Sequence, residues 1–155
     1  MTESRPNTVP WPPLIYGMAA VIAWGLGRVA PLGVLPRFEL AGLAIIGIGL
    51  GFDVSAMATM MRHRANILPH RAATALVTSG PFAVSRNPIY LGNTMVLVGL
   101  AAAFGNAWFL PAAGVAVLAV TEMAIRREEA HLAARFGSAW VAYAARVPRW
   151  FGWRG

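Results

Sequence analysis

Four long apolar stretches dominate this sequence and restrict what the chain can fold into. They lie near residues 14–30, 40–61, 90–108 and 109–125. About 20 helical residues cross a hydrocarbon core roughly 30 Å thick, and each stretch is close to that length. Only 12% of the residues are charged, about half of what a soluble domain carries. We therefore expect an all-α integral membrane protein with about four transmembrane helices, built as a single domain over residues 1–155.

The composition also excludes several kinds of site. The chain has no cysteine, which excludes disulfides, thiolate metal ligands and a thiol nucleophile. His63, His70 and His131 share no ligand spacing, so we expect no metal. The net charge of +7 comes entirely from arginine, and these residues flank the apolar stretches. Membrane topology therefore explains the charge, and we expect the lipid bilayer rather than nucleic acid as the partner.

The arginine positions predict the orientation. Ten of the 13 basic residues lie either between the second and third stretches or after the fourth. The positive-inside rule makes that side cytoplasmic. Both termini are then cytoplasmic in a multi-pass protein of the cytoplasmic (inner) membrane, with the loop at residues 31–39 outside. The segment 1–13 contains Glu3 and four prolines, so an uncleaved first span is preferred to a signal peptide.

A basic amphipathic helix is expected after the fourth span, from Arg126 to about Arg146, with Pro148 ending it. Its apolar stripe has spacings of four, four and three residues: Leu132, Phe136, Trp140 and Tyr143. Next come two arginines and two tryptophans that resemble an interfacial anchor: Arg149, Trp150, Trp153 and Arg154. The sequence thus predicts a C-terminal cytoplasmic or interfacial helix.

The run Ser85–Gly92 has features of a helix start that binds an anion. Asn87 suits an N-cap and Pro88 suits the first helical position, so the third span should begin here. A helix N-terminus carries free N–H groups and positive dipole character, and Arg86 adds a full charge. The alternative is a well-capped transmembrane helix with one topology-setting arginine.

Three acidic residues are the other chemical candidates. Glu128 and Glu129 stand among several arginines, either as a site for a cationic or polyhydroxylated ligand or as a solvated helix face. Asp53 lies inside the second span, where a carboxylate is costly. It either lines a pocket or pairs helices, or it is a protonated, hydrogen-bonded structural residue.

Taken together, several motifs resemble the isoprenylcysteine carboxyl methyltransferase family, which also embraces relatives of the phospholipid N-methyltransferases. The resemblance covers about residues 74–150, with these motifs in order: Leu76–Phe82, Arg86–Gly92, Glu128-Glu129, Phe136-Gly137, Trp140, Tyr143 and Val147–Arg149. The first two spans match only as generic apolar helices.

The resemblance implies a helical membrane enzyme that binds S-adenosyl-L-methionine without a Rossmann fold. Its cofactor-binding segments correspond to residues 66–92 and 122–150. The implied cofactor contacts are Thr74, Ala75, Leu76, Val77, Phe82, Arg86, Asn87, Pro88, Ile89, Tyr90 and Glu128. Asn87 stands where eukaryotic members have His, and Ala124 stands where they have a substrate-contacting Arg. A prenylcysteine carboxylate is therefore not the expected substrate.

We accordingly expect a methyltransferase that takes a lipophilic acceptor from the bilayer, with an amine, thiol or carboxylate as nucleophile. No catalytic base can be assigned, and Glu129, His131 and Asp53 are the candidates. The alternative is a non-enzymatic small four-helix membrane protein, such as a transporter subunit or assembly partner. A transporter places its polar residues at the bilayer midplane, whereas here they gather in two cytoplasmic segments, which favours the enzyme.

Overall fold

The structure is a computed structural model, and it describes residues 11–32, 35–65 and 75–151. Every regular element in these ranges is a helix, so the all-helical prediction is confirmed for them. In chain order the elements are α1 (Trp11–Val29), α2 (Glu39–Arg62), the short 3₁₀ helix η1 (Gly80–Ala83), α3 (Pro88–Phe104), α4 (Phe109–Val120), the π-helical turn η2 (Thr121–Ile125), α5 (Arg126–Phe136) and α6 (Ser138–Arg146).

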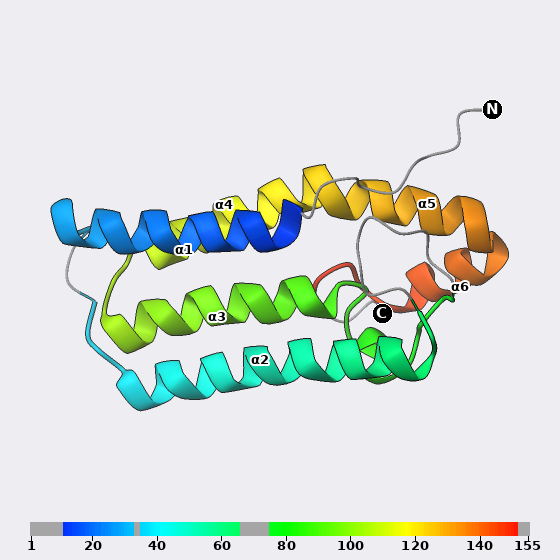
Figure 1. Ribbon diagram of the computed structural model, residues 1–155, viewed down its shortest axis with the longest axis horizontal. Helices are drawn as coiled ribbons and strands as arrows, with labels where there is room; N and C mark the ends of the chain where they lie inside the picture. Colours follow the sequence, from blue (N-terminus) through cyan, green and yellow to red (C-terminus); the bar gives the residue numbers. More distant parts are fainter. Residues whose placement is uncertain (1–10, 33–34, 66–74, 152–155) are drawn as a thin grey trace.

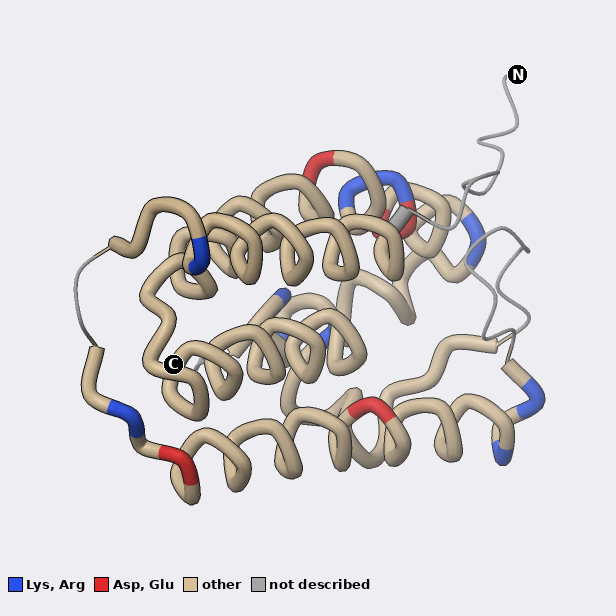
Figure 2. The backbone as a smooth tube through the Cα atoms, turned by 60° about the vertical axis from the view of Figure 1, so that its left-hand side comes forward, with Lys and Arg blue, Asp and Glu red and all other residues tan. Residues whose placement is uncertain are grey.

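The long helices form two layers, with α1 beside α4 and α2 beside α3 (Figure 1). The helices α5 and α6 continue beyond one end of the bundle, where η1 also lies. Charged positions gather mainly toward the two ends of the bundle (Figure 2). Exposed apolar side chains such as Val21, Leu50 and Leu118 lie along the bundle itself. This distribution suits a protein surrounded by lipid.

Two helices are long and apolar enough to cross a membrane. They are α2 and the continuous helix Phe109–Phe136, while Pro88–Phe104 is apolar but shorter. The predicted span at residues 90–108 is too long, because α3 ends at Phe104 and Gly105 turns the chain with φ of 65°. Four crossings stay a prediction.

Small residues hold α2 and α3 together along their length. A Cβ added at Gly49 would lie 2.6 Å from the carbonyl oxygen of Gly92, and one at Gly99 would lie 2.8 Å from that of Gly42. Glycine therefore lets the two backbones approach to contact distance, as is common between helices in membranes. This close pairing fixes the start of α3 against the C-terminal half of α2.

The helix that begins at Phe109 contains one extra residue in its turn η2. The buried residues of α4 form a stripe with steps of three or four residues that ends at Val120. In a regular α-helix, two further steps of four residues would bring this stripe to Glu128. The π-helical turn advances the stripe by one residue, because it adds a residue to that turn. The stripe therefore continues through the fully buried Ile125 to Glu129, while Glu128 is exposed.

The prediction of one helix from Arg126 to Arg146 is wrong. The chain breaks at Gly137, where φ is 49° and ψ is −121°, a conformation that glycine adopts most readily. Helices α5 and α6 therefore fold back on each other (Figure 1). The predicted apolar stripe still packs together, because its members meet in one small cluster with Leu76 and Val147: Leu132, Phe136, Trp140 and Tyr143.

Candidate functional site

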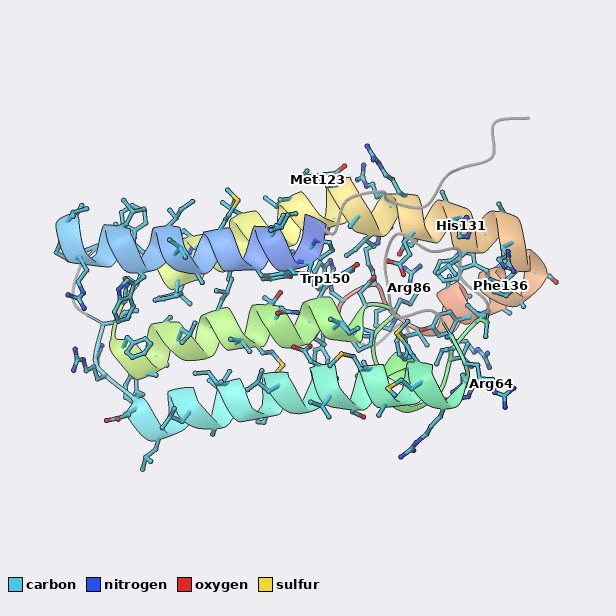
Figure 3. All side chains as sticks on the ribbon, in the orientation of Figure 1. Arg64, Arg86, Met123, His131, Phe136 and Trp150 are labelled. Carbon is cyan, nitrogen blue, oxygen red and sulfur yellow. The ribbon has the colours of Figure 1, made fainter. Side chains whose placement is uncertain are left out.

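Segments that are far apart in the sequence meet at the end of the bundle where α3 begins. The turn before α3, helices α5 and α6, and residues 147–151 all converge there. Figure 3 shows Arg86 and Trp150 near the start of α3, with His131 and Phe136 farther along α5. The prediction that the third apolar helix starts at Pro88 after Asn87 is confirmed.

The side chain of Asn87 does not cap α3. Its Nδ2 donates to the carbonyl oxygen of Arg149 at 2.9 Å, and Asn87 makes no capping hydrogen bond. The helical hydrogen-bond pattern of α3 begins with the N–H of Leu91, which donates to the carbonyl oxygen of Asn87 at 3.0 Å. The N–H groups of Ile89 and Tyr90 come before that residue, in the first turn of the helix. The first turn of α3 therefore keeps donors that could serve an anion.

Glu129 is clamped between two arginines. Its Oε1 lies 3.1 Å from an amino nitrogen of Arg86, and its side chain is 15% exposed. The guanidinium of Arg149 donates to both carboxylate oxygens, at 2.9 Å and 2.6 Å. A solvated helix face, one of the two alternatives for this glutamate, therefore does not describe Glu129. The tertiary fold turns this carboxylate inward onto residues 43 positions earlier and 20 positions later.

Arg86 occupies a different environment from the one expected of a free anion-binding residue. Its side chain is 7% exposed, and its guanidinium lies 5.6 Å from the ring centroid of Trp140. Its backbone N–H donates to the carbonyl oxygen of Pro148 at 2.9 Å. With Glu129 beside it, Arg86 joins the start of α3 to α5, α6 and the residues that follow.

Of the predicted interfacial anchor the structure describes Arg149 and Trp150, and both make contacts within the protein; their place at a membrane interface stays a prediction. Arg149 turns inward to Glu129, and its carbonyl oxygen accepts from Ser85 Oγ at 3.2 Å as well as from Asn87. Hydrogen bonding to Glu129 raises the pKa of the Arg149 guanidinium. Trp150 packs against the main core. Trp153 and Arg154 lie outside the described residues.

Tyr90 and Glu128 are brought together, as the predicted cofactor contacts require. The Tyr90 hydroxyl donates to Glu128 Oε2 at 3.5 Å, and Glu128 is exposed. Glu128 and Glu129 have different partners, because adjacent helical residues point about 100° apart. Glu128 is exposed as a residue, but burial of its carboxyl group raises the pKa of that group.

The described residues before α3 mainly make packing contacts and hydrogen bonds within the protein. Val77 is buried, Leu76 packs on the α6 cluster, and Ala75 is half-buried beside them in sequence. The carbonyl oxygen of Phe82 accepts from the Tyr143 hydroxyl at 2.8 Å. Burial raises the pKa of Tyr143, which keeps it a donor. Thr74, the remaining predicted contact of this segment, lies outside the described residues.

The two other candidate bases have buried atoms without polar partners in the described part of the chain. Asp53 Oδ1 lies against Gly92 of α3. His131 Nε2 is buried on α5. No group of three potential metal ligands occurs among the described residues. The structure thus places Asp53 between α2 and α3, and His131 one helical turn after Glu128.

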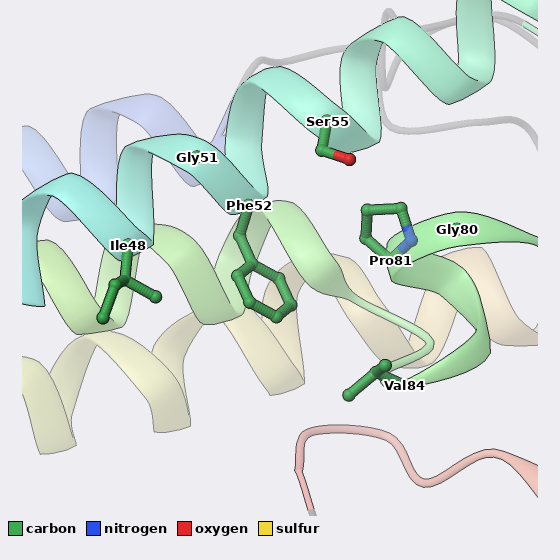
Figure 4. A pocket seen from close by; sticks show the side chains of 7 residues that line it. All are labelled: Ile48, Gly51, Phe52, Ser55, Gly80, Pro81 and Val84. Atoms are coloured by element: carbon green, nitrogen blue, oxygen red, sulfur yellow. The ribbon is translucent and has the colours of Figure 1, made fainter.

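An apolar groove of about 390 Å³ lies between α2 and η1, next to the predicted cofactor segment (Figure 4). It is lined by Ile48, Gly51, Phe52 and Ser55 of α2 and by Gly80, Pro81 and Val84. Ile48 and Val84 are exposed. The groove is therefore reached from outside the bundle.

Sequence reasoning gave no role at the site to three residues that assemble this end of the bundle: Ser85, Tyr143 and Arg149. Ser85 is fully buried and its Oγ accepts the N–H of Asn87 at 3.1 Å. The relevant motif, Val147–Arg149, was visible in the sequence, but its contacts with residues 82–87 are long-range. Local patterns carry no information about such contacts.

A profile of the phospholipid methyltransferase family matches residues 38–139. The protein is therefore a helical protein of the membrane-methyltransferase class, and the chain belongs to the phospholipid methyltransferase family. The resemblance drawn from the sequence motifs is thereby confirmed. Residues of α2, η1, α3, α4 and α5 all fall inside the matched range.

One curated relative is similar over part of its length. The nickel-cobalt-cadmium resistance protein NccN of Alcaligenes xylosoxydans xylosoxydans is 36% identical over 83 residues, which is 52% of this chain and 38% of NccN. The chain thus spans less than half of that relative. No solved structure matches.

Proposed function

We propose that this protein is an S-adenosyl-L-methionine-dependent methyltransferase that acts on a lipophilic acceptor at the cytoplasmic face of the membrane. Residues 1–155 form its single domain, and segments 66–92 and 122–150 hold the cofactor. One observation carries the proposal within a methyltransferase family. Glu128 lies beside the first turn of α3, where the hydroxyl group of Tyr90, 38 residues earlier in the chain, donates to its carboxylate.

The donor set fits the chemistry of the cofactor. S-Adenosylmethionine carries a carboxylate, an ammonium group, ribose hydroxyls and adenine. The uncapped N–H groups of Ile89 and Tyr90 suit the carboxylate, because a helix N-terminus favours negative charge. The carboxyl group of Glu128 suits the ammonium or the ribose. The bound cofactor would supply the methyl group as a sulfonium.

The remaining predicted contacts form the frame of this site. Arg86 and Asn87 are held by Glu129 and Arg149, so we assign them to shaping the start of α3 rather than to a direct ionic bond with the cofactor. Pro88 sets the first turn. Phe82 stands at the end of η1, where its backbone is held by Tyr143.

Methyl transfer to a neutral nucleophile is an in-line displacement, for which the protein chiefly supplies alignment and exclusion of water. A base is required only when the acceptor arrives protonated. Glu129 is the weakest of the three candidate bases, because both its oxygens already accept from arginine. Asp53 and His131 remain candidates for that role.

The acceptor is proposed to reach the site from the bilayer, with its hydrocarbon part in the groove between α2 and η1. The groove is apolar, open to the outside of the bundle, and bordered by Pro81 and Val84 just before α3. Because such a chain passes from one apolar medium to another, van der Waals packing against the groove, rather than exclusion of water, would hold it there. We further propose four crossings of the inner membrane with both termini cytoplasmic.

Titration of the detergent-solubilised protein with S-adenosylhomocysteine tests the cofactor assignment. We expect saturable binding with one site per chain. A separate sample without S-adenosylhomocysteine is incubated with methyl-labelled cofactor and a membrane lipid extract, and label should appear in the lipid fraction. No heat of binding, together with no label transfer, would contradict the proposal and favour a non-enzymatic role.

A further inference from the structure

The residues that follow α6, Val147–Phe151, are called the C-terminal strap here. The strap is joined to the turn before α3 by three hydrogen bonds that the structure shows. The N–H of Arg86 donates to Pro148, and both Ser85 Oγ and Asn87 Nδ2 donate to the carbonyl oxygen of Arg149. One carbonyl group of the strap therefore determines where the Asn87 side chain points.

The Arg149 side chain holds that carbonyl in place through Glu129. Two parallel N–H···O bonds of 2.9 Å and 2.6 Å join the guanidinium to the carboxylate, a bidentate geometry that restricts orientation as well as distance. Glu129 also contacts Arg86 at 3.1 Å on the other side. It is thus the one carboxylate that links the strap, α5 and the start of α3 among the described residues.

The direction of the Asn87 side chain matters for the donors of α3. An asparagine at the N-cap position ordinarily accepts from the second or third helical N–H, which here belong to Ile89 and Tyr90. In this structure Asn87 instead donates to Arg149, and it makes no cap. The strap therefore keeps the Asn87 side chain away from both N–H groups, one of which it would otherwise occupy.

We propose that Glu129 is the positioning residue of the cofactor site, acting through Arg149 and Asn87 without contacting the ligand. Glu129 holds Arg149, the Arg149 carbonyl withdraws Asn87 from the helix start, and the first turn of α3 stays open to an anionic group. This inference rests on the proposed function, and it names how that site is kept ready. Loss of the Glu129 charge releases Arg149 and lets Asn87 cap α3.

The test compares Glu129→Gln with Glu122→Gln in the full-length protein in detergent. Glu122 is a matched control, because it lies on the same continuous helix and its ion pair with Arg126, four residues on, is exposed. Calorimetric titration with S-adenosylhomocysteine should show affinity about tenfold weaker for Glu129→Gln with full stoichiometry, and a change below about twofold for Glu122→Gln. A merely structural role would lower the stoichiometry and leave the dissociation constant of the folded fraction unchanged, which would overturn the inference.

A second substitution tests the relay itself. Asn87→Ala cannot cap α3, so adding it to Glu129→Gln should recover at least half of the lost affinity on a logarithmic scale. No recovery would overturn the role assigned to Asn87. Should Glu129→Gln fail to fold, Arg149→Lys replaces it, since lysine keeps the charge but loses the bidentate fork.

Hydrogen exchange of the Ile89 and Tyr90 amides provides a readout that needs no cofactor. Both should exchange rapidly in the wild type, and at least one of them several-fold more slowly in Glu129→Gln, because the Asn87 side chain then accepts from one of these N–H groups. Unchanged exchange in the variant would overturn the inference even for a protein that binds no cofactor. Absence of wild-type binding, with the exchange change present, would instead contradict the proposed function alone.

Discussion

The backbone N–H of Arg86 donates to the carbonyl oxygen of Pro148 at 2.9 Å, which joins two turns that lie 62 residues apart in the chain. Around this bond the start of α3 and the end of α6 form one unit with α5. This unit contains parts of both segments assigned to the cofactor. Mutations in any part of it should therefore change cofactor affinity.

Replacing Glu128 with Gln should weaken S-adenosylhomocysteine binding by roughly 1.5–3 kcal/mol, the contribution of a charge-assisted hydrogen bond to a desolvated partner. Tyr90→Phe removes only the donor to Glu128, so its cost should be about 1 kcal/mol. Calorimetry on both variants measures the difference. Wild-type affinity for Glu128→Gln would mean that this carboxylate does not face the ligand.

The groove between α2 and η1 can be filled without a clash. Neither Gly47 nor Gly51 has any atom within 4 Å of an added Cβ, yet only Gly51 lines the groove. We expect Gly51→Leu to raise the KM for a lipid acceptor several-fold and to leave cofactor affinity unchanged. Gly47→Leu, one helical turn away, is the control. Identical acceptor kinetics in the two variants would exclude the groove as the acceptor path.

The acceptor should be a lipid with an amine or thiol nucleophile rather than a prenylcysteine carboxylate. Ala124 is 1% exposed within the main core, so no cation stands at that position, and the nearby Arg86 and Arg149 are engaged by Glu129. Label transfer to an amine lipid, a long-chain thiol and a farnesylcysteine analogue should be compared. Efficient methylation of the farnesylcysteine analogue alone would refute this preference.

Two glycines of α2 should differ sharply in their effect on stability. An added Cβ at Gly49 would lie 2.6 Å from the Gly92 carbonyl oxygen, whereas Gly47 faces open space. Gly49→Ala should therefore cost about 1–3 kcal/mol. Gly47→Ala should be neutral or stabilise by up to about 1 kcal/mol, because alanine favours the helix. Thermal unfolding in one detergent ranks the pair, and equal unfolding temperatures would show that α2 and α3 pack more loosely than described.

Reporter fusions test the orientation. A reporter at the C-terminus should be cytoplasmic, and one inserted in the loop at residues 31–39 should be external, because ten arginines then lie inside. In the fold, this loop contacts the end of α3 through the N–H of Phe38 and the carbonyl oxygen of Ala102, at 2.9 Å. An external C-terminus would contradict both the four crossings and a site open to cytosolic cofactor.

The amino-acid sequence by itself determined the helical membrane-type architecture, the start of α3 after Asn87 and the convergence of polar residues in two segments. These features follow from local properties, namely apolar length, cap and proline chemistry, and charge bias. The motifs also identified the family, which the profile match confirms over residues 38–139.

Only the tertiary structure decided which glutamate turns inward. Regular α-helical spacing carries the buried stripe of α4 to Glu128, but the π-helical turn at Thr121–Ile125 adds one residue and carries it to Glu129. The break at Gly137 then folds α6 back, so that Arg149 reaches Glu129 and draws Asn87 away from the helix that it begins. These contacts span 20 to 62 residues, and their geometry depends on how whole helices pack, which local spacing does not encode.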